Sequence, residues 1–147
     1  MREMKEALPI EAVTLALDVG TRTIGIAVAE RGIVLPVCTL ARQSVVKDCA
    51  RIVDLCAMRS VGVVVVGLPY ELDGTETRSA RLARQVGQAV AATGMPVHYQ
   101  DERFSTVEAL SRLGEAGVYG DRRKAAVDQI AAVVILEEWL KGRRPGS

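Results

Sequence analysis

The sequence predicts an α/β domain with one mixed five-stranded sheet, three antiparallel strands followed by parallel ones, flanked by helices. Three observations lead to this prediction. The first third of the chain alternates short apolar segments with tight turns, as antiparallel strands do. From residue 44 onward, apolar residues recur at helical spacing. Short β-branched runs separate these helical segments, and strands that alternate with helices form parallel sheets.

The 147 residues are expected to form a single domain, with its core over about 13–140, a flexible arm at 1–11 and a frayed tail at 142–147. Three strands come first, at residues 13–19, 23–29 and 33–40. Short turns join them, so they are expected to pair as an antiparallel meander.

The next element is expected to be a helix that begins after Ser44, whose side chain can cap it. Its apolar residues recur every three or four positions, which is typical of a helix that buries one face. The predicted buried stripe consists of Val46, Ala50, Val53 and Ala57, with Ile52 and Cys56 beside it.

Two further strands alternate with helices in the second half. The valines at 63–66 predict a strand buried on both faces, and a short strand is expected at 97–100. Helices are expected from 75 or 77 to about 93, from Ser105, and from about 123 to 140. If the first strand runs parallel to the last two, their carboxyl ends meet at one edge, where active sites of such sheets lie. The helix that ends near 93 carries Ala80, Ala83, Val86, Gly87 and Val90.

Composition excludes several classes of protein. Aromatic residues make up only 3%, so the core must be built from Val, Leu, Ile and Ala. The net charge of +1 argues against a non-specific polyanion binder but allows a local basic patch. Three cysteines and a single histidine give no support for zinc and predict a reducing, cytoplasmic compartment. The N-terminus has no signal-peptide pattern, and the longest apolar run is too short for a bilayer, so no membrane partner is expected.

Three carboxylates stand where burial is costly. Asp18 ends the first strand, Glu102 follows the 97–100 strand, and Asp128 lies in a nearly all-apolar helix. A carboxylate in such a place is costly to desolvate unless it is paired or binds a cation. Each one alone could instead cap a turn or a helix, or interact with a helix dipole. Together they predict one shared site for Mg²⁺ or Mn²⁺, since these ions prefer oxygen ligands.

Such a site suits the hydrolysis of a phosphodiester. Two ions roughly 4 Å apart can clamp the attacking and leaving oxygens. In this interpretation Asp18 contacts both ions, Glu102 holds one and Asp128 the other. Asp101 is a candidate fourth ligand, although strand alternation lets only one of Asp101 and Glu102 face Asp18. No Ser-His-Asp or Cys-His arrangement competes, because the one histidine, His98, is expected to be structural.

Polar residues near the acids are candidates for contacts with a nucleic-acid backbone. Thr21 and Arg22 follow Asp18 closely, and Arg103 can hold a phosphate through two parallel hydrogen bonds. Two basic clusters are further candidates, although ordinary solvated surface explains them equally well. These clusters are Arg78 with Arg81 and Arg84, and Arg122 with Arg123 and Lys124.

Four segments in this order resemble the bacterial YqgF (RuvX) family. They are LDVGTRTIGIAV (17–28), VVGLP (65–69) with DGTE (73–76), DERFST (101–106) and VDQIAAVVIL (127–136). The resemblance covers roughly residues 13–140, which is nearly the whole chain.

That resemblance implies an RNase H-like fold and a nuclease that depends on Mg²⁺ or Mn²⁺. Members of the family are described as Holliday-junction resolvases and as nucleases that mature the 5′ end of pre-16S rRNA. The implied partners are structured RNA or branched DNA, with ribosomal particles as a further partner, for a monomer or homodimer. Asp18, Glu102 and Asp128 match the acidic positions of the family. The positions that would face the nucleic-acid backbone are Arg22, Arg103, Ser105 and Thr106.

The chain departs from the family pattern in two places. Ala29-Glu30 stands where the family often has Ser-Asp, and three secure acids stand where related resolvases use four. Two other functions stay open. The Asp-x-Gly-Thr segment at 18–21 also resembles the phosphate loop of actin-like ATP-binding proteins, but those use two such domains and this chain has length for one. A non-catalytic nucleic-acid-binding assembly factor is the other alternative.

Overall fold

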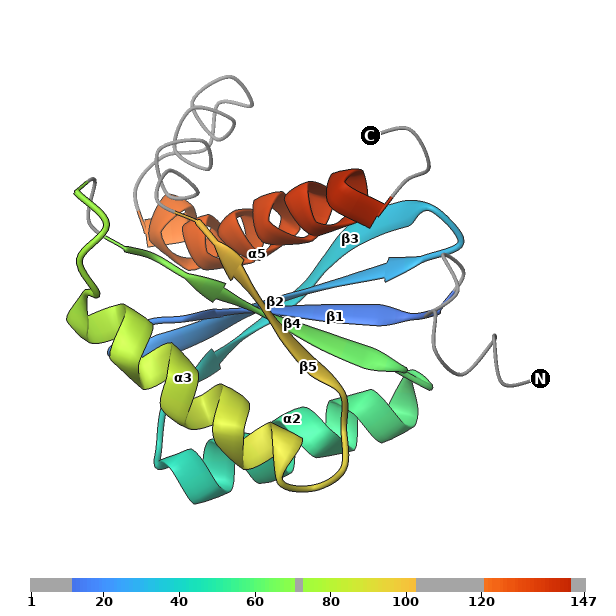
Figure 1. The fold of residues 1–147 in the computed structure, drawn as a ribbon, viewed down its shortest axis with the longest axis horizontal. Helices are drawn as coiled ribbons and strands as arrows, with labels where there is room; N and C mark the ends of the chain where they lie inside the picture. The colour runs from blue at the N-terminus through green and yellow to red at the C-terminus, as the bar shows by residue number, and fades with distance from the viewer. Residues whose placement is uncertain (1–11, 71–72, 103–120, 144–147) are drawn as a thin grey trace.

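A five-stranded mixed sheet forms the centre of the molecule (Figure 1). The computed structural model describes residues 12–70, 73–102 and 121–143, without the side chains of 121–125. In space the strand order is β3-β2-β1-β4-β5. The first three strands are antiparallel, and β4 and β5 run parallel to β1, which confirms the predicted sheet. The strands are β1 (Thr14–Val19), β2 (Thr23–Glu30), β3 (Ile33–Ala41), β4 (Val63–Leu68) and β5 (Val97–Asp101).

Helices cover both faces of this sheet. Figure 1 shows α2 (Val45–Met58) and α3 (Arg78–Ala91) on one face and α5 (Asp121–Arg143) on the other. The tail predicted at 142–147 begins too early, because α5 continues through Gly142 and Arg143. The helix predicted from Ser105 lies outside the described residues. None of the helices described here combines the length and the apolar character needed to cross a bilayer.

Alternation along the strands divides the core into two layers. Leu15, Leu17 and Val19 face α2 and α3, whereas Ala16 faces α5. All of Val63–Leu68 is buried, as the run of valines predicts. The layer under α5 is built largely from small side chains, so this helix lies close to the sheet. These residues are Ala16, Ala27 and Ala29 on the strands and Ala132 on α5.

The sequence predicts the wrong buried face for α2. Ser44 does cap the helix, since its Oγ accepts a hydrogen bond from the backbone N–H of Lys47 at 3.1 Å. However, Val46 is 79% exposed, and Ala50 and Ala57 are exposed as well. Instead, Asp48 points inward, where it is fully buried and forms ion pairs with Arg42 and Arg51. The buried residues are Asp48, Cys49, Ile52 and Cys56.

Two single substitutions test which face of α2 is buried. Ile52 is fully buried, so Ile52→Ala should lower the free energy of unfolding by about 2–5 kcal/mol. Val46→Ala should change it by less than about 0.5 kcal/mol, because the side chain is already in solvent. Urea denaturation of both variants measures the difference. Equal losses would contradict the buried face described here.

Candidate functional site

The carboxyl ends of β1, β4 and β5 lie at the same edge of the sheet, and Asp18 lies there near the end of β1. Asp18 is paired in register with Gly25 of β2. On the other side, Leu17 is paired with Val66, which brings the next residue of β4, Gly67, beside Asp18. Asp18 is therefore flanked on the α5 face by two residues without side chains.

Gly25 brings Asp128 to this edge. A Cβ on Gly25 would lie 2.0 Å from the carbonyl oxygen of Asp128 and 2.7 Å from its Cβ, so α5 rests directly on β2. The hydroxyl of Thr23 donates a hydrogen bond to the Asp128 carboxylate. The next residue of α5, Gln129, donates from Nε2 to Oγ1 of Thr39 at 3.0 Å. Two side-chain hydrogen bonds between the sheet and α5, one donated from each side, thus fix this part of the helix.

Gly67 makes room for Ile135 of α5 and lies within contact distance of Glu102. A Cβ on Gly67 would lie 3.7 Å from Cγ of Glu102 and 2.4 Å from Cδ1 of Ile135. The backbone N–H of Glu102 donates to the carbonyl of Leu68 at 3.0 Å, which continues the pairing of β5 with β4. Glu102 is only 7% exposed. Its side chain therefore lies over Gly67, between the sheet and α5.

Burial and neighbouring carboxylates make the charges of Asp18 and Glu102 costly. Burial raises the pKa of Asp18 to about 7, and the nearby charge of Asp128 adds to the rise. Burial raises the pKa of Glu102 to about 8, with further contributions from Glu138, Asp101 and Asp18. Asp18 thus interacts electrostatically with both of the other acids. A cation bound between them would remove this repulsion.

The donor chemistry of these residues fits a hard divalent cation, since all three supply carboxylate oxygens. In the described part of the chain, no group of three or more His, Cys, Asp and Glu residues is close enough to hold one ion. Besides burial, the charge of Asp128 affects the pKa of Asp18. The pKa of Glu102 is affected, besides burial, by Glu138 and Asp101 before Asp18. A ligand shell of all three carboxylates around a single ion is therefore not preformed.

Strand alternation separates Asp101 from this group. Tyr99 packs against α3, where its hydroxyl lies 2.5 Å from a Cβ built on Gly87, whereas the ring of His98 stacks on Trp139 of α5 at 4.9 Å. Asp101 shares the side of Tyr99, and Glu102 shares the side of His98. This arrangement favours Glu102 over Asp101 as the acid that faces Asp18.

The structure describes only some of the residues that the sequence predicts to contact nucleic acid. Thr21 and Arg22 are exposed in the turn after β1, next to Asp18, and Arg78 is exposed at the start of α3. Arg84 is engaged elsewhere, because it bonds Glu76 at 2.6 Å and the hydroxyl of Tyr70 at 2.5 Å. Arg81 is exposed as well. The other predicted residues, or their side chains, are outside the described part of the chain. These are Arg103, Ser105, Thr106, Arg122, Arg123 and Lys124.

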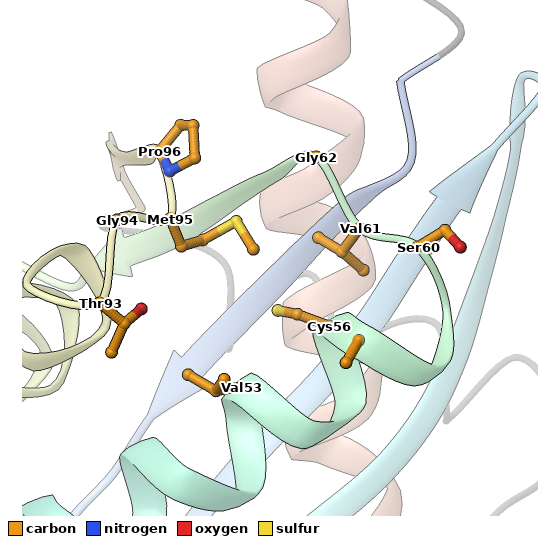
Figure 2. A pocket seen from close by; sticks show the side chains of 10 residues that line it. Val53, Cys56, Ser60, Val61, Gly62, Thr93, Gly94, Met95 and Pro96 are labelled. Atoms are coloured by element: carbon orange, nitrogen blue, oxygen red, sulfur yellow. The ribbon is translucent and has the colours of Figure 1, made fainter.

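A cavity of about 480 Å³ lies at the opposite end of the parallel strands (Figure 2). It opens between the C-terminal ends of α2 and α3, and Gly62 and Pro96, which precede β4 and β5, line it. Its lining contains apolar groups such as Val53 and Met95, two hydroxyls and the thiol of Cys56, with no charged side chain. The cavity therefore offers none of the acid or basic groups that the carboxylate edge provides.

Three comparisons place the chain among known proteins. A family model described as RuvX, Holliday junction resolvase, matches residues 12–142. A Myxococcus xanthus protein provisionally named pre-16S rRNA nuclease is 40% identical over 136 residues, which cover 90% of this chain and 89% of the relative. An Anaeromyxobacter protein with the same name is 44% identical over 137 residues, which cover 88% and 96%.

A solved structure supports the fold. Thermus thermophilus RuvC in complex with a Holliday junction substrate matches with a TM-score of 0.58 at 17% identity, covering 90% of this chain and 95% of that chain. This likeness confirms the RNase H-like fold.

Replacing Gly25 tests the close approach of α5. In Gly25→Ala the new Cβ would collide with the backbone of Asp128, which cannot rotate away as a side chain could. We expect the free energy of unfolding to fall by about 3 kcal/mol or more. The control is Gly142→Ala in α5, where a Cβ meets nothing within 4 Å and should be neutral or stabilise by up to about 1 kcal/mol. Equal effects in urea denaturation would contradict the packing described above.

The raised pKa values predict a pH-dependent stability in EDTA. The unfolded chain ionises at the ordinary pKa values of 3.8 for Asp18 and 4.5 for Glu102, whereas the folded chain keeps these protons to about 7 and 8. The contribution of these two groups to stability is therefore lost as pH rises from about 4 to about 8. Urea denaturation at pH 5 and pH 8 should show a smaller loss for Asp18→Asn than for the wild type. Parallel losses would refute the shift at Asp18.

Proposed function

The chain belongs to the RuvX family, and from that premise we propose that it is a divalent-metal-dependent nuclease that matures the 5′ end of pre-16S rRNA. The observation that carries this proposal is the meeting of Asp18, Glu102 and Asp128 at one edge of the sheet, with Asp18 flanked by Gly25 and Gly67. The names of the Myxococcus and Anaeromyxobacter relatives support the choice of RNA.

Asp18, Glu102 and Asp128 would hold Mg²⁺ or Mn²⁺. When bound, such ions supply Lewis acids for the phosphodiester and positive charge for the carboxylates. If two ions bind, Asp18 and Asp128 would hold one, and Asp18 and Glu102 would hold the other. Thr23 orients the Asp128 carboxylate through its hydroxyl. Because the pKa values of Asp18 and Glu102 are raised, binding near neutral pH would release protons from these side chains.

Residues around this edge would hold the nucleic-acid backbone. Thr21 and Arg22 are exposed beside Asp18, so a phosphate at the acids would lie within their reach. Arginine suits this role because its guanidinium can donate two parallel hydrogen bonds to a phosphate. The further residues proposed to contact the strand are Arg78, Arg103, Ser105, Thr106, Arg122, Arg123 and Lys124.

A second candidate function is the resolution of Holliday junctions, which the description of the matching family model favours. Such a reaction cuts two strands related by symmetry, so the enzyme would act as a two-fold homodimer. The processing of an RNA end needs only one active site, and a monomer would suffice. The two functions therefore differ in both substrate and assembly.

The proposal is tested with labelled pre-16S rRNA and a four-way DNA junction, each incubated with Mn²⁺ or with EDTA. We expect Mn²⁺-dependent cleavage at the RNA 5′ end and a loss of at least about 100-fold in Asp18→Asn, since it removes the shared ligand. The control, Asp54→Asn, changes an exposed carboxylate on α2 and should cleave like the wild type.

The outcomes separate the alternatives. Cleavage of the junction alone, by a dimer, would favour the resolvase. Full activity in Asp18→Asn would refute the proposed site. Binding of the RNA by the wild type without cleavage of either substrate would indicate a non-catalytic assembly factor.

A further inference from the structure

A buried ion pair lies outside the carboxylate edge, in the first turn of α2. Asp48 is fully buried, and its Oδ2 accepts a hydrogen bond from Nε of Arg42 at 3.0 Å. Its Oδ1 accepts from the backbone N–H of Gln43 at 3.0 Å and from Nη2 of Arg51 at 2.8 Å. Burial alone would raise the pKa of Asp48, but the bonds from Gln43, Arg51 and Arg42 hold it below its usual value. Asp48 is therefore an ionised anchor.

Arg42 connects this anchor to the turn between β1 and β2. Its backbone N–H donates to the carbonyl of Arg22 at 2.8 Å, and its Nη1 donates to the carbonyl of Gly20 at 3.4 Å. The same turn is closed by a bond from Gly20 N–H to the carbonyl of Thr23 at 2.8 Å. The Arg42 side chain is only 11% exposed, so it has little freedom to move away.

This turn joins two residues of the candidate site. Asp18 lies just before it, and Thr23, which donates to Asp128, lies at its end. Thr21 and Arg22 between them are exposed, so side-chain packing does little to fix their backbone. The hydrogen bonds to the carbonyls of Gly20 and Arg22 supply the restraint in its place.

Arg51 makes a useful contrast. Like Arg42, it bonds Asp48, but its other hydrogen bond in the described part of the chain runs to the carbonyl of Ala41 at 2.6 Å. It therefore links α2 to the end of β3 rather than to the turn. Both arginines neutralise the same buried carboxylate, and Arg42 alone of the two also holds the β1–β2 turn.

We propose that Arg42, itself held by Asp48, is a positioning residue that fixes the β1–β2 turn so that Thr21 and Arg22 are held beside Asp18. Buried ion pairs contribute little net stability compared with apolar packing, so the role we assign to this one is to fix one conformation of the turn. The effect on cleavage rests on the proposed function. The effect on the order of the turn does not.

The test compares Arg42→Met with Arg51→Met. Each variant removes one guanidinium from Asp48 and keeps an unbranched apolar side chain, so each should lower stability. Amide hydrogen exchange, measured by NMR, reports the turn through the N–H of Gly20, with the N–H of Leu17 in β1 as the internal reference. We expect Gly20 exchange, relative to Leu17, to rise roughly tenfold or more in Arg42→Met and to stay near the wild-type value in Arg51→Met.

Kinetics provide the second readout. For pre-16S rRNA we expect KM to rise roughly tenfold in Arg42→Met with a smaller change in kcat, because the contacts of Thr21 and Arg22 are loosened. Arg51→Met should keep both values near those of the wild type. A purely structural role would affect the two variants alike.

Each outcome decides the proposal. Equal exchange at Gly20 in the two variants would overturn it. A difference in exchange with no cleavage by the wild type would uphold the positioning role and refute the proposed nuclease. If Arg42→Met does not fold, Arg42→Lys takes its place, since one ammonium keeps a charge against Asp48 but cannot span Asp48 and Gly20 as the guanidinium does. Unchanged Gly20 exchange in Arg42→Lys would also overturn the proposal.

Discussion

The close contact of α5 with β2 at Gly25 is the constraint on which the site depends. The helix backbone at Asp128 occupies the space where any other residue would place its Cβ. Such an approach is possible because the strand residues that face α5 near this contact are small, among them Ala16 and Ala27, and Ala132 faces them from the helix. A helix and a sheet that meet through larger side chains would be separated by several more ångströms. The proximity of Asp128 to Asp18 is thus a consequence of packing.

This packing brings like charges together at an energetic cost. Burial and the charge of Asp128 raise the pKa of Asp18. Burial and three neighbouring acids raise the pKa of Glu102. The apolar contacts of α5 with the sheet, such as Ile135 over Gly67, must offset that cost. Functional sites in general are held in unfavourable arrangements by the surrounding structure. In this chain, the apolar layer between α5 and the sheet holds these acids together against their repulsion.

The sequence predicts the sheet well because its signals are local. Alternation in 23–29, the valines at 63–66 and the order of strands and helices suffice for the topology that the structure confirms. The three acids can be picked out from the sequence as candidates because a carboxylate among apolar residues is unusual within its own segment. The roles of Gly25 and Gly67 could not be predicted, since they depend on which residue of a neighbouring strand or helix lies opposite. A glycine inside an apolar strand was the one available signal.

The rotation of α2 was missed for a related reason. A stripe of Val46, Ala50, Val53 and Ala57 fits helical spacing as well as the real one, and hydrophobicity counts Asp48 as a solvent-facing residue. What turns Asp48 inward is a pair of arginines, one of them before the helix, and only the folded chain brings them together. Apolar periodicity cannot detect a buried ion pair, because both partners are scored as surface residues.

Asp48 and Asp18 show that burial alone does not mark a functional carboxylate. Asp48 lies on α2 and Asp18 on the opposite face of the sheet, and Arg42 connects the two regions because it bonds both Asp48 and the carbonyl of Gly20. Around Asp48 the chain provides two guanidinium groups and a backbone N–H, and its pKa is lowered. Asp18 instead has a second carboxylate, Asp128, nearby, and burial together with that charge raises the pKa of Asp18. The contrast between these two acids supports the proposal that a cation balances the charge beside Asp18.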